Sequence, residues 1–80
     1  MIHARPDYQR FQDPEGKIGF SEPVMLFRAQ DKHMAKVVAY YLFLLAKDPL
    51  TQPPMMDAIA DHLRHIHQWQ AQNNTKTPDM

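Results

Sequence analysis

Polar residues able to bind a small anion gather in two parts of the first half of the chain. One group lies in the N-terminal arm and the other near residue 30, and the candidate ligand-binding residues are Tyr8, Arg10, Gln12, Arg28, Gln30 and Lys32. Arginine offers forked donors to carboxylate or phosphate, lysine adds charge, tyrosine can stack on a ring, and glutamine can bond to polar edges. If the arm packs beside the second group, this pattern predicts a pocket for a small anionic or nucleotide ligand.

The same residues also have a structural interpretation. Ion pairs such as Asp13–Arg28 or Asp31–Arg10 would attach the arm to a helix, because an ordered arm needs partners for its polar groups. A binding site and a network of attachment contacts use the same residue types. The sequence therefore leaves both interpretations open.

A carboxylate and three imidazoles occur close together in the second half of the chain, at Asp61, His62, His65 and His67. Asp61 and His65 are four positions apart, so they share one face of a helix, and such a set can bind Zn²⁺ or Ni²⁺. No HExxH-type spacing and no evident fourth ligand accompany them. We therefore favour solvent-facing side chains with a weak Asp61–His65 pair, and we predict no metal site.

Residues for nucleophilic catalysis are scarce. The chain has no cysteine, and its one serine, Ser21, stands where a helix cap belongs rather than in a glycine-framed turn. Two glycines are too few for a phosphate-binding loop. We expect no catalytic residues, no cofactor and no enzymatic activity.

The size and charge of the chain narrow the classes of protein. With 80 residues it makes a single domain, and the core of such a small domain gives about 3–5 kcal/mol at best, so oligomerisation is a natural source of stability. A formal net charge of +0 does not suit binding to a nucleic-acid duplex, which needs a basic surface. The longest apolar run, Val37–Ala46, is about half the length of a membrane span, so we expect no membrane contact.

Hydrophobic periodicity and turn signals predict an all-α fold. We expect an ordered N-terminal arm over residues 1–20, an antiparallel helical hairpin over residues 21–72, and a flexible polar tail over residues 73–80. The short, proline-rich connection between the two long helical segments is the reason for expecting a hairpin.

The boundaries of the helices follow from capping residues and prolines. Ser21-Glu22-Pro23 has the composition of a helix start, so we predict helix there, with a strand at Val24–Phe27 as the alternative. Asp31 is expected to cap a helix that ends at Lys47, and the last helix should run to about Gln72. Before these helices, Asp13-Pro14-Glu15-Gly16 predicts a type I turn.

Two apolar stripes run along the segment 32–47. The first is a core stripe shared with the next helix, and its residues are Met34, Val37, Val38, Tyr41, Leu42 and Leu45, facing Met55, Met56, Ile59, Leu63 and Ile66. A second stripe lies on the far side, and the candidate interface residues are Tyr40, Phe43 and Leu44, with Trp69 near the open end of the hairpin. Either the N-terminal arm folds back over this stripe or, as we favour, it forms a subunit interface of a homo-oligomer.

Two short elements near the start of the chain are similar to a known pattern. They are RPDYQRFQDP at residues 5–14 and EPVMLFRAQD at residues 22–31. Over about the first 35 residues the chain resembles a family of short uncharacterised bacterial and phage proteins with an RPDYxRxQDP element followed by EPVxLxRxQD. Gln9 and Phe11 stand where that family has Asn and Ile, and Ala29 stands where Gly is common. The family implies no activity.

A looser likeness, of architecture only, is to the small helical-hairpin proteins with which phages sequester cyclic nucleotide signals of host defence. Those proteins are oligomeric, poor in cysteine and without catalysis, and they build ligand sites between subunits. We accordingly expect a small non-enzymatic, phage-derived protein in the cytoplasm of a host bacterium that captures a small anionic or nucleotide ligand. The alternative is an inhibitor or adaptor that binds a host protein through its exposed aromatic face.

Overall fold

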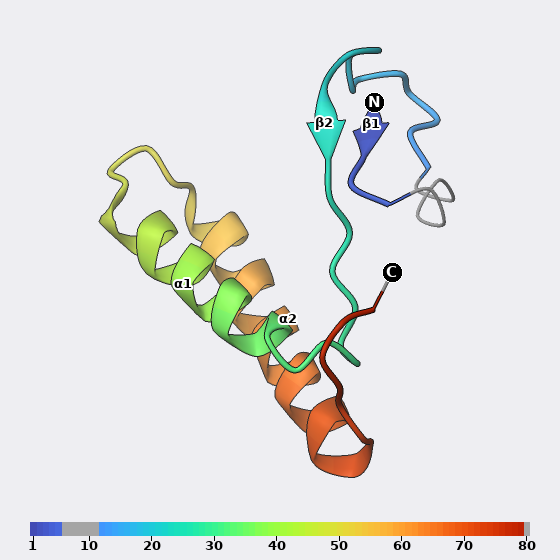
Figure 1. Ribbon diagram of the computed structural model, residues 1–80. Helices are drawn as coiled ribbons and strands as arrows, with labels where there is room; N and C mark the ends of the chain where they lie inside the picture. Colours follow the sequence, from blue (N-terminus) through green and yellow to red (C-terminus); the bar gives the residue numbers. More distant parts are fainter. Residues whose placement is uncertain (6–11, 80) are drawn as a thin grey trace.

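The computed structural model describes residues 1–5 and 12–79. The elements in chain order are β1 (Ile2–His3), β2 (Pro23–Val24), α1 (Met34–Lys47) and α2 (Pro53–Gln72). The two helices lie side by side as the helical hairpin that the sequence predicts, and the short sheet lies to one side of it (Figure 1). The sheet is a departure from the expected all-α class.

The sheet joins the N-terminus to the segment that precedes the hairpin. Its two strands are parallel, with Ile2 opposite Pro23 and His3 opposite Val24. The Ile2 N–H donates to the carbonyl oxygen of Glu22 at 2.7 Å. The helix predicted to begin at residues 21–23 is therefore wrong, and the alternative strand is correct only at Val24. The strand that pairs with β2 lies some 20 residues earlier in the chain. This non-local pairing outweighs the local helix propensity of the segment.

The turn at residues 13–16 is confirmed. The Gly16 N–H donates to the Asp13 carbonyl oxygen at 3.0 Å, and Gly16 has a φ of 63°, a conformation that glycine adopts at no steric cost. The Asp13 carboxylate then accepts the N–H groups of Lys17 (3.1 Å) and Ile18 (2.9 Å). This carboxylate closes its own loop and does not pair with Arg28.

α1 begins two residues later than expected. The residue that precedes the first turn of the helix is His33 rather than Asp31. Asp31 lies two residues before His33 and accepts hydrogen bonds from the backbone there. Its Oδ1 accepts the His33 N–H at 2.8 Å, and its carbonyl oxygen accepts the Met34 N–H at 3.0 Å. An aspartate that satisfies a nearby backbone N–H in this way favours a turn, which separates β2 from the helix.

α2 has the boundaries that its sequence predicts. Pro53 opens the helix, where the missing N–H needs no partner, and Gln72 is its last residue. In the connection, the Asp48 Oδ1 accepts the Leu50 N–H at 2.9 Å. This short connection returns the chain against α1.

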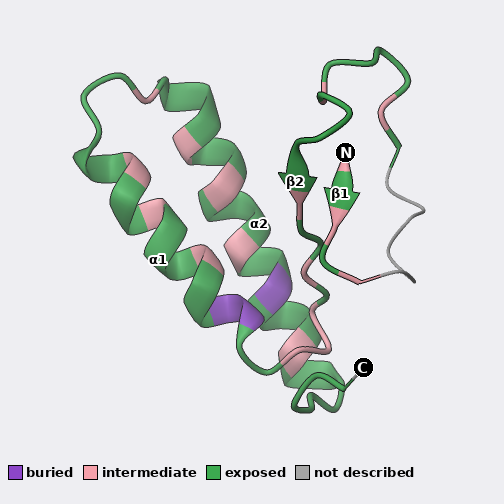
Figure 2. Ribbon diagram, turned by 45° about the horizontal axis from the view of Figure 1, so that its top comes forward, coloured by how far each residue is buried: buried purple, intermediate pink, exposed green. Residues whose placement is uncertain are grey.

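The core is small and lies at the open end of the hairpin. Met34, Ala35 and Ile66 are the buried residues of the described part of the chain, and Figure 2 shows them together where α1 begins and α2 nears its end. Phe27, Ala29, Val38 and Leu63 pack against this cluster. The predicted core stripe is only partly confirmed, because Val37 and Tyr41 of α1 and Met55 of α2 are exposed.

The C-terminal tail pairs with the segment that precedes α1. Lys76 forms an isolated parallel bridge with Asp31. The Lys76 N–H donates to Gln30 at 2.8 Å, and its carbonyl oxygen accepts the Lys32 N–H at 3.0 Å. Residues that we expected in a flexible tail thus lie against the turn before α1. Among the described residues, neither helix combines the length and the apolar character that a membrane span requires.

Candidate ligand pocket

A pocket of about 280 Å³ lies between the N-terminal strand, the segment 25–31 and the C-terminal tail. Its residues come from three distant parts of the chain: Ala4, Arg5, Met25, Leu26, Phe27, Arg28, Gln30, Asp31, Lys76, Pro78 and Asp79. The volume is at the small end of the range of about 300–1,000 Å³ that is typical of ligand pockets. It suits a small molecule rather than a peptide.

The segment 29–31 is held in place by α2 and by the tail. The Gln70 Nε2 donates to the carbonyl oxygens of Ala29 (3.0 Å) and Asp31 (3.3 Å). The bridge of Lys76 attaches the same segment from the other side. Because both supports are hydrogen bonds to backbone, the wall of the pocket is positioned without using the side chains of Arg28 or Gln30.

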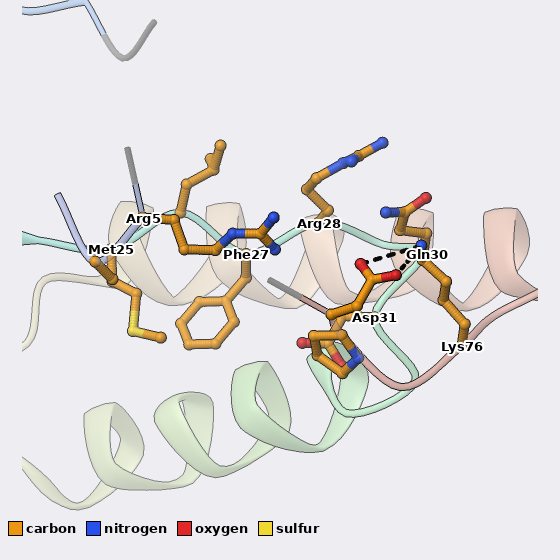
Figure 3. Close-up of a pocket in the computed structure, with 11 residues that line it drawn as sticks. Arg5, Met25, Phe27, Arg28, Gln30, Asp31 and Lys76 are labelled. Carbon is orange, nitrogen blue, oxygen red and sulfur yellow. Dashed lines mark hydrogen bonds and ion pairs between the residues drawn. The ribbon is translucent and has the colours of Figure 1, made fainter. Parts of the chain in front are cut away.

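Apolar side chains make up much of the pocket lining. Met25, Leu26, Phe27 and Pro78 contribute to it, and Phe27 also packs against the core of the hairpin. Figure 3 shows Met25, Arg5 and Phe27 at one end of the pocket and Gln30, Asp31 and Lys76 at the other, with Arg28 between them. The pocket therefore combines an aromatic and aliphatic lining with polar groups along one side.

Three cationic and two anionic side chains surround the pocket, and the acids already have partners. The Asp79 carboxylate oxygens each lie 3.5 Å from the Lys76 Nζ, and Asp31 accepts the N–H of His33. Within the described residues, the guanidinium of Arg28 has no hydrogen bond or ion pair. An arginine in this state can take a carboxylate or phosphate with two parallel hydrogen bonds.

The pocket contains some of the residues that the sequence analysis singled out and not others. Arg28 and Gln30 line it, whereas Lys32 and Gln12 are exposed outside it. Tyr8 and Arg10 lie outside the described residues, as does the proposed Asp31–Arg10 pair. Of the described residues of the N-terminal arm, Ala4 and Arg5 line the same pocket as Arg28 and Gln30.

Sequence reasoning missed Arg5, Phe27 and Lys76 as pocket residues. Arg5 had a weak signal, since it belongs to the polar N-terminal group. Phe27 looked like part of an apolar helix, and Lys76 stands in a polar tail without periodicity. Only the β1–β2 pairing and the Asp31–Lys76 bridge bring these residues together.

The acid and histidine side chains on α2 are exposed, as expected, but the expected pair is not formed. The Asp61 carboxylate pairs with Arg64, one turn along the helix, rather than with His65. Among residues 1–5 and 12–79, no three histidine or acidic side chains come close enough together to hold a metal ion.

The candidate interface residues are exposed on the hairpin. Tyr40, Phe43, Leu44 and Trp69 all keep a large exposed fraction, which reaches 62% for Tyr40. Tyr40 and Phe43 stack with 6.1 Å between ring centroids, and the Lys47 Nζ lies 4.3 Å from the Phe43 centroid. No described part of the N-terminal arm buries this stripe, so the interpretation that the arm covers it is wrong for the described residues.

Comparisons with protein-family models, with curated proteins and with solved structures found no match to this chain. The functional argument therefore rests on the geometry of the pocket and of the hairpin surface.

Proposed function

We propose that this is a non-enzymatic binding protein whose pocket takes a small anionic ligand with an apolar or planar body. The single observation that carries the proposal is the guanidinium of Arg28, which has no hydrogen bond or ion pair within the described residues and lies beside an apolar lining that includes Phe27. A pocket of this kind offers one charge-assisted contact and one stacking or apolar contact. Nucleotides have both features, and they are the class that the architectural likeness favours.

The charge balance of the pocket supports an anion over a cation. Arg5, Arg28 and Lys76 outnumber Asp31 and Asp79 by one. The Lys76 ammonium and the Asp79 carboxylate pair with each other, so the remaining balance is two arginines against the Asp31 carboxylate.

Native mass spectrometry of the protein purified from cells tests this proposal first. Extra mass of a few hundred daltons per site would identify the ligand directly. Isothermal titration with mononucleotides, cyclic nucleotides and aromatic carboxylates then measures affinity. A hydrogen bond to a charged group contributes about 1.5–3 kcal/mol, so Arg28→Ala should weaken binding by about tenfold or more.

A matched control variant distinguishes a contact in the pocket from a general effect of the protein's charge on ligand affinity. Lys36→Ala removes an exposed cation of α1 that does not line the pocket, and it should leave the affinity unchanged. If Arg28→Ala and Phe27→Leu both bind the identified ligand as tightly as the unmodified protein, the pocket is not the binding site and the proposal fails.

Binding of a host protein is the second candidate function, and the stacked pair of Tyr40 and Phe43 favours it. Aromatic side chains that remain half exposed are typical anchors of protein interfaces. Phe43→Glu should abolish capture of such a partner, whereas Arg28→Ala should not. The opposite pattern would refute this second candidate.

A further inference from the structure

One broad side of the hairpin is largely apolar, has no lysine, arginine or carboxylate, and is left uncovered by the described residues. Each residue of an α-helix is rotated by 100° from the one before it, so the buried positions show which side of each helix faces the other. Beside this contact, each helix has a row of residues at its edge. Because the helices are antiparallel, one row from α1 and one from α2 lie on the same side of the hairpin. We call this surface the seam face, and its residues are Val37, Tyr41, Leu44, Met55, Ala58 and Trp69.

The exposure of the seam face is uniform along the hairpin. Its five large side chains are between 40% and 45% exposed, so each is partly covered by the rest of the protein and partly open to solvent. On the opposite side of the seam, Ala35 is buried, and Phe27 and Ala29 pack against the cluster to which it belongs. One side of the hairpin is thus covered near its open end by the chain's own N-terminal segment, and the other has no cover from the described residues.

Charged side chains of the two helices avoid the seam face. By the same rotation, Lys36 and Lys47 of α1 lie on the outer surface of the hairpin, as do Asp57, Asp61 and Arg64 of α2. The only titratable side chains among the helix positions at the α2 edge of the seam face are His62 and His65. A stripe without lysine, arginine or carboxylate over the length of both helices is the composition of a helix–helix interface.

The exposed area of the chain exceeds that of a compact monomer. A folded monomer of 9.4 kDa is expected to expose about 5,000 Å², whereas this chain exposes 6565 Å². An interface of standard size removes about 800 Å² from each partner. The excess of the whole chain, which includes the N-terminal arm and the C-terminal tail, is larger than the area that one such interface removes.

We propose that a second copy of this chain covers the seam face, so that two hairpins form a four-helix bundle. Two helices alone make a single layer and cannot bury both sides, while two hairpins packed face to face bury one side of each. The seam face has a large side chain at its open end and a small one near the connection, which suits a two-fold axis perpendicular to the helices. Trp69, at the open end, would then meet the partner's small Ala58 near the connection.

Ala58 and Ala60 provide a matched pair of variants for testing this dimer. Both are exposed alanines of α2. A rotation of about 200° between them turns Ala58 toward the seam face and Ala60 away from it, and both border the surface that carries Asp57, Asp61 and Arg64. Arginine keeps good helix propensity at both positions. Ala58→Arg would place a charge within the proposed interface, whereas Ala60→Arg adds the same charge outside it.

Light scattering during size exclusion measures the mass of the ligand-free protein, which should be twice 9.4 kDa for the unmodified chain and for Ala60→Arg. Ala58→Arg should dissociate at least tenfold more readily while keeping its helical circular dichroism. The chain has one tryptophan, so Trp69 emission should shift to longer wavelength on dilution as the dimer separates.

An unmodified chain that is monomeric at about 100 μM, far above the Kd of about 1 μM or less typical of stable interfaces of this size, would overturn the dimer and leave the seam face to a different protein. Equal dissociation of Ala58→Arg and Ala60→Arg would overturn the assignment of the face. Neither measurement involves ligand, so failure here is distinct from failure of the pocket proposal.

Discussion

Replacing Gln70 by alanine tests whether α2 supports the wall of the pocket. The amide Nε2 of Gln70 donates to the carbonyl oxygens of Ala29 at 3.0 Å and Asp31 at 3.3 Å, and the side chain is partly buried. Each such hydrogen bond contributes about 0.5–1.5 kcal/mol, and the longer one less. Gln70→Ala should therefore lower the free energy of unfolding by about 1–2 kcal/mol.

The assay is urea denaturation followed by circular dichroism, at one fixed protein concentration because a dimer would make stability depend on concentration. For a domain of this size, 1 kcal/mol corresponds to a shift of about 4–8 °C in Tm. Gln68→Ala is the matched control, since Gln68 is an exposed glutamine of the same helix. It removes the same side chain without touching the segment 29–31.

Hydrogen exchange gives a local reading of the same change. The N–H groups of Lys32 and Lys76 bond across the junction that Gln70 supports. Both should exchange faster in Gln70→Ala than in Gln68→Ala, because the segment 29–31 opens more often. If the two variants have the same free energy of unfolding and the same exchange rates at Lys32 and Lys76, Gln70 does not hold the pocket wall.

Three further changes test the core, a turn and the pocket rim. Ile66→Val should cost about 0.5–1.5 kcal/mol of unfolding free energy in urea, since Ile66 is only 3% exposed; no loss would contradict the small core. Gly16→Ala should cost about 1 kcal/mol from its φ of 63°, and Gly16→Asn should recover much of it. Lys76→Ala should leave stability within about 0.5 kcal/mol, because its ion pair is exposed, yet weaken anion binding in titration; unchanged affinity would exclude it from the site.

The helices that form the hairpin were predictable from the sequence because their determinants are local. Apolar residues recur at helical spacing in α1 and α2, and Pro53 marks the start of α2. The turn at Asp13–Gly16 was predictable for the same reason, since aspartate, proline and glycine each act on their own backbone. These parts required no knowledge of distant contacts.

The strand at Pro23–Val24 and the pocket depended on contacts between remote residues. Pairing of β2 with Ile2–His3 overrides the helix propensity of the segment around Met25, and no feature within that segment indicates its partner. The pocket joins Arg5 to Arg28 and Lys76 across most of the chain. The cost of closing such loops is met only by contacts present in the folded state, so local patterns do not reveal them.

Which apolar residues are buried was likewise decided by the tertiary structure. The sequence determined that α1 has apolar residues on more than one side, and both Val38 and Tyr41 matched the periodicity of a core stripe. In the hairpin Val38 packs on the core, whereas Tyr41 stays exposed. A helix can pack against only as many neighbours as the chain supplies, and here a single helix partner leaves one edge of the stripe open to solvent.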